Sequence, residues 1–496
     1  MTGTLRVWPG LAGVLLAGWI TPASASQPCD TLRGARVGHA VVVDARSAAA
    51  GEFRQAGLPD QAVGGVAVPE TCRLTVVASP VEGSRIEFEP WLPATGWNRR
   101  LKMLGNGGYS SALPYRHMAG AVAAGYAVTA TDTGHKGDDP AFAIGLPQSI
   151  VDWGHRAVHE TIVAAKHLTG QFYGRLADFT YFEGCSTGGQ QGLMEAQRYP
   201  ADFDGIVAGA PGNNRTRLNV GFLWQFVANH RADGTLILPA SKLGLLQEGS
   251  LRACGTESER TRGFLENPLS CRFDPADLVC TNNAASDCLT TEEAAAARRL
   301  YAGARNPRTG AQIYPPWPPG SEVGWSLYWA DPRDPRQPAR ANFFRFWAFG
   351  DPGWDWRSFD FDRSMRLIDP KLMRAIDAVE PDLSRFARGG GKLIIYQGLA
   401  DPVVSPHDTV RYFDRIWGSG SIDTADFARL FLVPGMAHCG GGPGAIDLKA
   451  DLALEAWVER GMAPELLPAT EATQLAPPLG ICARGRAGDE CRRNRR

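Results

Sequence analysis

The most constraining stretch of the sequence is Gly184-Cys185-Ser186-Thr187-Gly188, in which a serine lies between two glycines at the spacing G-x-S-x-G. The apolar residues 178–182 before it predict a buried strand, and the helix-forming residues 190–199 after it end at Pro200. Between a strand and a helix such a serine occupies a sharp, strained turn, so its neighbours must be small. The stretch therefore predicts that Ser186 is a nucleophile; the alternative is a glycine-rich turn with a bystander serine.

Strands alternate with helices on both sides of this turn. β-branched and apolar runs predict strands at 34–43, 73–78, 85–91, 101–104, 126–130 and 204–209, with a helix at 155–168. The alternation stops near residue 212 and resumes with strands at 392–396 and 430–433 and helices at 406–417 and 446–460. Such alternation indicates a mostly parallel sheet flanked by helices. We expect an α/β core in two parts, 27–212 and 381–482, an inserted lid domain, 213–380, and a tail, 483–496.

The predicted insertion has few regular patterns but many aromatic residues. Thr290–Leu300 reads as a helix with Thr290 or Thr291 as its N-cap. The simplest interpretation of the aromatic residues is the core of an irregular, disulfide-linked subdomain. The alternative is that some of them line a pocket that faces Ser186. The residues concerned are Trp317, Trp325, Tyr328, Trp329, Phe343, Phe344, Phe346, Trp347, Trp354 and Trp356.

The N-terminus has the pattern of a secretory signal peptide. Arg6 supplies the positive charge, residues 11–20 are apolar, and Ala23-Ser24-Ala25 resembles a cleavage site, so we expect residues 1–25 to be removed. No later segment is apolar enough to span a membrane, and a net charge of −1 recruits neither nucleic acid nor an anionic membrane. We therefore expect a secreted or periplasmic protein, monomeric or homodimeric.

Ten cysteines in an exported chain indicate disulfides. None of their spacings gives the paired C-x-x-C of a zinc site, and the sequence predicts no metal ligands. Proximity suggests three pairs, and Cys29 with Cys72 is a plausible fourth. This leaves Cys185, directly before the serine, and Cys439, directly after His438. A bridge between them would hold Ser186 and His438 in register. The alternative is that each of these two cysteines pairs with a different cysteine. The three proximity pairs are Cys254–Cys271, Cys280–Cys288 and Cys482–Cys491.

An acid and a histidine follow later strands in the order expected for a catalytic triad. Asp401 lies after the strand at 392–396 and His438 after the strand at 430–433, so the chain order Ser, Asp, His matches that of α/β-hydrolases. Ser186 would attack a carbonyl, His438 would take and return the proton, and Asp401 would hold the imidazole. The oxyanion would be held by backbone N–H groups of Thr187 and of Gly107 or Gly108, so replacing the Thr187 side chain is expected to have a mild effect.

Other histidines compete for a role. His407 is near Asp401 in sequence but is predicted on the following helix, pointing elsewhere. His155 and His159 have i,i+4 spacing but lack the glutamate of H-E-x-x-H and a third ligand, so we interpret them as surface or supporting residues. Asp132 and His135 are loop residues at the end of the strand at 126–130; they could support the site, but we favour a structural role.

On these residues the chain resembles the tannase and feruloyl esterase family, whose members carry Cys-Ser, Asp and His-Cys in this order. Here these are Cys185-Ser186, Asp401 and His438-Cys439, and the stretches 105–108 (Gly-Asn-Gly-Gly) and 132–135 (Asp-Thr-Gly-His) also look like family stretches. The resemblance implies an α/β-hydrolase with an inserted lid and a bridge between the two cysteines. It also implies a serine esterase for esters of aromatic acids: galloyl, feruloyl or related cinnamoyl esters, or terephthalate monoesters.

The sequence departs from the resemblance at the calcium loop of the lid. Family lids open this loop with Cys-Asp and carry further aspartates three and seven positions on, whereas this chain has Gly255, Ser258 and Arg262 there. Calcium requires several hard oxygen ligands, so we expect no cofactor and no calcium. The Arg262 guanidinium could replace the ion by pairing with a lid carboxylate; the candidates are Glu257, Glu259 and Asp274.

The sequence thus predicts a secreted serine esterase that acts on a small aromatic ester. A rival of the same class is an exported general carboxylesterase or peptidase. A rival of another class is a catalytically silent binding protein that keeps the fold. The intact set Ser186, Asp401 and His438 favours an enzyme over the silent protein.

Overall fold

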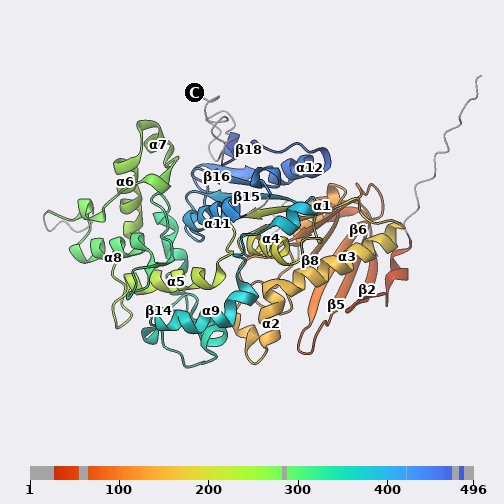
Figure 1. Cartoon of the computed structure of the whole chain (residues 1–496), viewed down its shortest axis with the longest axis horizontal. Helices are drawn as coiled ribbons and strands as arrows, with labels where there is room; N and C mark the ends of the chain where they lie inside the picture. The colour runs from red at the N-terminus through yellow and green to blue at the C-terminus, as the bar shows by residue number, and fades with distance from the viewer. Residues whose placement is uncertain (1–26, 55–64, 282–286, 420–421, 472–479, 485–496) are drawn as a thin grey trace, which may run out of the picture.

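The structure is a computed structural model and describes residues 27–54, 65–281, 287–419, 422–471 and 480–484. The predicted signal peptide and most of the predicted tail lie outside these residues. A ten-stranded sheet forms the centre of the fold (Figure 1). Its strands, in spatial order, are β1 (Arg36–Val37), β2 (Ala40–Ala48), β5 (Thr71–Ala78), β6 (Ile86–Pro93), β8 (Ala127–Thr131), β7 (Arg100–Leu104), β9 (Phe179–Cys185), β10 (Gly205–Gly209), β15 (Lys392–Gly398) and β16 (Ala428–Val433).

The sheet has two parts that differ in strand direction. The N-terminal strands β1, β2, β5 and β6 pair antiparallel, and β6 pairs antiparallel with β8. From β8 to β16 every pairing is parallel. The carboxyl ends of β7, β9, β10, β15 and β16 therefore lie along one edge of the sheet, where loops from distant parts of the chain meet. This arrangement is an α/β-hydrolase core.

Helices cover both faces of the parallel part, because its strands are apolar on both sides. In β15, Leu393 and Ile395 pack into one cluster with α3 (Ala157–Tyr173), α4 (Thr187–Arg198) and α11 (Pro406–Ser419). The residue between them, Ile394, packs on the opposite face with α12 (Ala450–Arg460), while α1 (Tyr115–Ala123) covers that face beside β8. The alternation follows from the two-residue period of a strand.

The chain between β10 and β15 forms the predicted insertion, seen at the left and lower centre of Figure 1. Short two-stranded ladders join its helices, and a second apolar core fills it. The predicted helix at Thr290–Leu300 is α8, with Thr290 as its N-cap in a capping box with Glu293. The elements of the insertion are α5 (Arg215–Asn229), α6 (Leu243–Cys254), α7 (Glu257–Arg262), α8 (Thr291–Ala302), β11 (Ala304–Arg305), β12 (Gln312–Tyr314), β13 (Ala330–Asp331), β14 (Asp334–Pro338) and α9 (Arg363–Ile376).

Three segments differ from the prediction. Residues 34–43 form two strands, because the chain reverses at Gly38 (φ 54°), so β1 pairs with β2. The predicted helix 446–460 begins only at 450, because residues Ala445–Leu448 form β17, which pairs with β18 (Leu466–Glu471). The predicted tail also begins inside the fold, since Ala483 bridges to Phe431 of β16. The remaining elements are β3 (Gly51–Phe53), β4 (Val66–Val68), α2 (Pro147–Val151), α10 (Ser384–Arg388) and β19 (Gly480–Cys482).

Candidate active site

Ser186 lies at the point where β9 ends and α4 begins, with φ of 63° and ψ of −116°. A non-glycine residue rarely adopts such a positive φ, so neighbouring contacts must hold it there. The Ser186 N–H donates to the Gly209 carbonyl at 2.9 Å, and the Ser186 carbonyl accepts from the Gly212 N–H at 3.0 Å. A Cβ at Gly184 would lie 2.6 Å from the Gly188 carbonyl carbon, which explains the glycine on that side of the turn. The turn presents the hydroxyl at the carboxyl edge of the sheet.

Asp401 and His438 lie on the loops that follow β15 and β16, at the same edge. His438 Nδ1 and Asp401 Oδ2 are 2.9 Å apart, and the Asp401 side chain is fully buried. The other oxygen, Oδ1, accepts hydrogen bonds from the backbone N–H groups of Val403 (2.7 Å) and Val404 (2.9 Å), while Gln397 Nε2 donates to Oδ2 at 2.9 Å. Because Nδ1 donates to a carboxylate, Nε2 of His438 is the nitrogen free to accept a proton.

A disulfide joins the serine turn to the histidine loop. Cys185 and Cys439 are bridged across 254 residues of sequence, with their Cα atoms 5.8 Å apart. Each cysteine is bonded directly to a predicted catalytic residue, so the bridge limits how far Ser186 and His438 can separate. Among the described residues the Ser186 hydroxyl has no hydrogen-bond partner, which is common for a nucleophile without substrate.

The structure contains three further disulfides at pairs that the sequence suggests. The pair Cys482–Cys491 lies outside the described side chains. The three bridges are Cys29–Cys72, Cys254–Cys271 and Cys280–Cys288.

The loop after β7 contacts the start of α4 at the predicted oxyanion site. Among the described residues, the N–H groups of Thr187, Gly107 and Gly108 donate to no protein acceptor. The Thr187 hydroxyl donates to the Gly108 carbonyl at 2.9 Å, which ties the two segments together. A Cβ at Gly105 would lie 2.7 Å from the Gly188 Cα, so only glycine allows this approach. The free N–H groups suit a developing negative charge on a carbonyl oxygen.

Arg215, which the sequence did not single out, lies beside this site. It begins α5, its side chain is buried, and its guanidinium donates to the Thr187 hydroxyl. The Arg215 guanidinium lies 5.6 Å from the Tyr109 ring centroid and 5.0 Å from that of Trp153. Its side-chain hydrogen-bond partner among the described residues is a hydroxyl and not a carboxylate, and burial lowers its pKa. The Thr187 side chain thus has two hydrogen-bond partners. These contacts argue against the expectation that replacing the Thr187 side chain has only a mild effect on activity.

Aromatic residues of the insertion mainly form its core. The Trp317, Trp325 and Trp347 side chains are almost fully buried in one apolar cluster. Trp347 also reaches the oxyanion loop, because its ring lies 5.3 Å from that of Tyr109. Arg340 is half-buried, and its guanidinium lies 5.2 Å from the Tyr109 ring and 4.8 Å from the Tyr328 ring.

Asp132 and His135 lie in the turn after β8, and His135 contacts the backbone of the predicted oxyanion loop at Tyr109. His135 is buried, its ring stacks on Phe142, and its Nε2 lies 2.8 Å from the Tyr109 carbonyl oxygen, to which it donates. Asp132 accepts a hydrogen bond from the Gly134 N–H at 2.8 Å and so shapes the same turn.

The remaining histidines do not join the triad. His407 lies on α11, and burial lowers its pKa to about 4. His155 Nδ1 is 2.8 Å from the Tyr199 hydroxyl, and His159 pairs with Asp202.

The carboxylates that the sequence places near the expected calcium loop are engaged with other groups. Arg262 pairs with Glu266 at 2.8 Å, not with any of the three carboxylates expected for it. Those three have other partners: Glu257 pairs with Arg260, Glu259 closes the capping box of α7 with Thr256, and Asp274 pairs with Arg298. The carboxylates of this loop are thus engaged by arginines or by N–H groups rather than directed at a common point.

Comparison with known proteins identifies a matching family and several similar proteins. A family model described as tannase and feruloyl esterase matches residues 72–492. An uncharacterised esterase of Xanthomonas campestris pv. campestris is 33% identical over 507 aligned residues, covering 93% of this chain and 87% of that protein. A probable feruloyl esterase B-1 of Aspergillus terreus is 29% identical and covers 82% of this chain and 80% of its own length.

Solved structures show the same architecture. The crystal structure of feruloyl esterase B from Aspergillus oryzae superposes with a TM-score of 0.83 at 25% identity, covering 92% of this chain and 95% of that one. A tannin acyl hydrolase from Aspergillus niger has a TM-score of 0.73 at 19% identity over 93% of this chain and 90% of that one, which shows a common fold.

Proposed function

The chain belongs to the tannase and feruloyl esterase family and is a carboxylic ester hydrolase, and from this premise we propose that it cleaves esters of aromatic acids through an acyl-enzyme on Ser186. One observation carries the assignment of the site. A strained serine turn is covalently joined to a loop whose histidine is hydrogen-bonded to a buried aspartate. No other histidine–carboxylate pair among the described residues lies beside a serine on such a turn.

The geometry supports a two-step mechanism. Ser186 attacks the ester carbonyl while His438 Nε2 accepts its proton, and Asp401 stabilises the resulting imidazolium. The oxyanion forms near the free N–H groups of Thr187 and of Gly107 or Gly108. His438 then gives the proton to the leaving alkoxide, and water activated by His438 hydrolyses the acyl-enzyme.

The partly exposed Arg340 and Tyr328 near the oxyanion loop support an aromatic acyl group, while the aromatic cluster behind the loop is buried and only holds it in place. Tyr109 directly follows Gly108 and belongs to a cluster with Trp153 and Trp347. The half-buried Arg340 stacks over the Tyr328 ring and lies near Gly108, where its guanidinium can meet a polar substituent of the substrate ring. Relatives named as feruloyl esterases act on such aromatic esters, which supports the same class here.

A substrate panel tests this proposal. We expect the purified enzyme to hydrolyse methyl ferulate, methyl gallate or a terephthalate monoester with higher kcat/KM than ethyl acetate, and to leave a peptide intact. Ser186→Ala should lower kcat by at least about 10⁴-fold at unchanged melting temperature, because triad members act as a unit. Substantial activity in Ser186→Ala would contradict the nucleophile, whereas equal kcat/KM on ethyl acetate would contradict only the aromatic acyl group.

We propose further that the protein is exported and works outside the cytoplasm as a monomer or homodimer. Four disulfides among the described residues suit an oxidising compartment. No described helix is long and apolar enough to cross a membrane. N-terminal sequencing of the protein recovered from periplasm and medium should begin after Ala25, and size-exclusion chromatography gives the oligomeric state. A chain that retains Met1 and stays in the cytoplasm would contradict export.

A further inference from the structure

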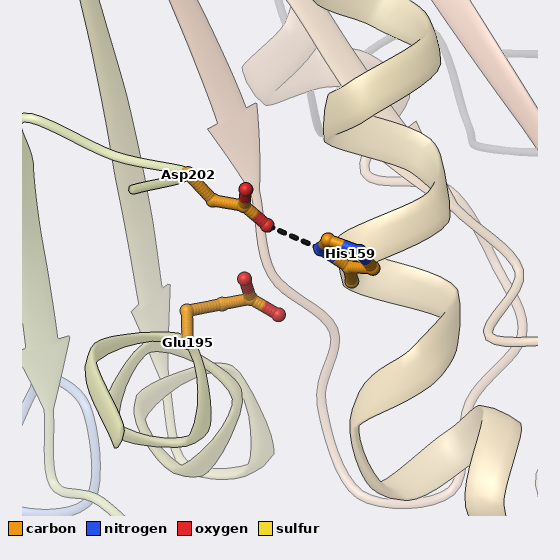
Figure 2. A group of neighbouring side chains, drawn as sticks. All are labelled: His159, Glu195 and Asp202. Atoms are coloured by element: carbon orange, nitrogen blue, oxygen red, sulfur yellow. Dashed lines mark hydrogen bonds and ion pairs between the residues drawn. The ribbon is translucent and has the colours of Figure 1, made fainter. Parts of the chain in front are cut away.

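A second group of ionisable side chains lies behind the active site, between α3 and α4 (Figure 2). His159 comes from α3, Glu195 from the last turn of α4, and Asp202 from the loop between α4 and β10. Their ligand atoms all lie within 4.8 Å of one another, and His159 Nδ1 is 2.6 Å from Asp202 Oδ2. Figure 2 shows the Glu195 carboxylate directed toward the other two side chains.

Glu195 is the unusual member of this group. It is 1% exposed, and apart from the neighbouring Asp202 carboxyl group, with which it could share a proton, neither carboxylate oxygen has a hydrogen-bond partner among the described residues. The nearby cations are engaged elsewhere, because Lys166 donates to the Ala201 carbonyl and Arg198 to the Arg374 carbonyl. Two buried carboxylates that no cation meets are unfavourable side by side, so the fold would gain from a positive charge at this point.

We propose that His159, Glu195 and Asp202 bind a divalent transition-metal ion, with zinc as the best match. One imidazole nitrogen and two carboxylate oxygens are ligands that zinc accepts, and two carboxylates balance its charge. Bonds of about 2 Å in a tetrahedron place ligand atoms about 3.3 Å apart. Small side-chain rotations reach that geometry, since the present separations run from 2.6 Å to at most 4.8 Å.

The surroundings suit an ion held by three protein ligands with one position left to water. The Tyr199 ring stacks on the His159 imidazole at 3.9 Å and orients it, while His155 bonds to the Tyr199 hydroxyl and is not a ligand. The His159 side chain is 31% exposed, which gives an ion access from solvent. Glu195 is nine residues along α4 from Ser186, about 13 Å at the rise of an α-helix. The ion would therefore tie the far end of the nucleophile helix to α3 without touching substrate.

Metal binding by the full-length, tag-free mature protein tests the proposal. After dialysis against a chelator, isothermal titration should show one zinc bound per chain, and the melting temperature should rise by several degrees in excess zinc. Glu195→Gln should weaken zinc binding at least tenfold and abolish the rise. His167→Asn is the matched control, because this exposed histidine lies on the same helix, and it should behave as wild type. Cobalt in place of zinc should give a visible absorption band in wild type that Glu195→Gln lacks.

A different outcome would overturn the site. The rival arrangement is a proton shared between Glu195 and Asp202, which needs no ion. It predicts that wild type binds no zinc at micromolar concentration and that added zinc leaves its melting temperature unchanged. Equal zinc binding by wild type and Glu195→Gln would also refute the proposal. If Glu195→Gln fails to fold, His159→Asn at its partly exposed position gives the same comparison.

Discussion

Removing the Cys185–Cys439 bridge should affect catalysis more than its effect on stability alone would suggest. The chain-entropy relation for a closed loop gives about 5.5 kcal/mol for this bridge, whose loop spans 254 residues, and about 4 kcal/mol for Cys29–Cys72, whose loop spans 43. The two bridges thus stabilise the fold by similar amounts. Only Cys185–Cys439 adjoins the serine and histidine, so only its loss should displace them.

The assay compares two double variants. Cys185→Ala with Cys439→Ala should lower kcat about 10- to 100-fold on the best panel ester, since a displacement of about 1 Å costs about that much. Its affinity for the product acid should change less. Cys29→Ala with Cys72→Ala, far from the site in the antiparallel part of the sheet, should lower the melting temperature but keep kcat at temperatures where it is folded. Equal kcat losses in both variants, or none in either, would refute a positioning role for the bridge.

Three further predictions concern other parts of the molecule. Thr187→Val should lower kcat, because it leaves the Gly108 carbonyl and the buried Arg215 without a hydrogen-bond partner, each at a cost of about 1–3 kcal/mol. Thr187→Ser keeps the hydroxyl and should have a kcat near that of wild type; equal losses of kcat in both variants would contradict this. Melting temperatures in calcium chelator and in millimolar calcium should coincide, since Arg262 pairs with Glu266, and a clear rise with calcium would show that the loop binds it. Burial raises the pKa of Asp377 to about 7. The contribution of this carboxyl group to folding stability is therefore complete below pH ~4 and is lost as the pH rises through 7. In calorimetry, the melting temperature of Asp377→Asn relative to wild type should rise progressively from pH 5 to pH 8, and a constant difference would contradict this.

The parts of the site that follow strands could be located from sequence. Ser186, Asp401 and His438 each come directly after an apolar run, and parallel strands bring their carboxyl ends to one edge whatever lies between them. The strand pattern needs only local periodicity, which the sequence carries. The same reasoning placed Gly107 and Gly108 at that edge.

Parts that depend on packing between distant segments were not predictable in the same way. Arg215 reaches Thr187 only because α5 begins next to the serine turn, and nothing in its spacing reveals this. Arg262 was expected to pair with another carboxylate. It pairs instead with Glu266, which is only four residues further along the chain. The group around Glu195 escaped notice because His159 lies in a different helix from its partners.

The strand at Ala445–Leu448 was hidden for a related reason. It was read as the first turn of a helix, and only its pairing with β18, further along the chain, makes it a strand. In a short segment that lacks an alternating pattern, pairing with a neighbouring strand decides the secondary structure.

The long disulfide also dictates an order of events during oxidative maturation. On the proposed route of export, Cys185 would leave the translocation channel long before Cys439, with the four cysteines of the insertion between them. Those four pair with partners only 17 and 8 residues away, whereas Cys185 cannot form its native bridge until a residue 254 positions later arrives. Among these three bridges, the one beside the predicted nucleophile would therefore close last, when nearly the whole chain has been delivered. A later proteolytic cut anywhere between Ser186 and His438 would leave the serine and the histidine on separate pieces that the bridge keeps in one covalent molecule.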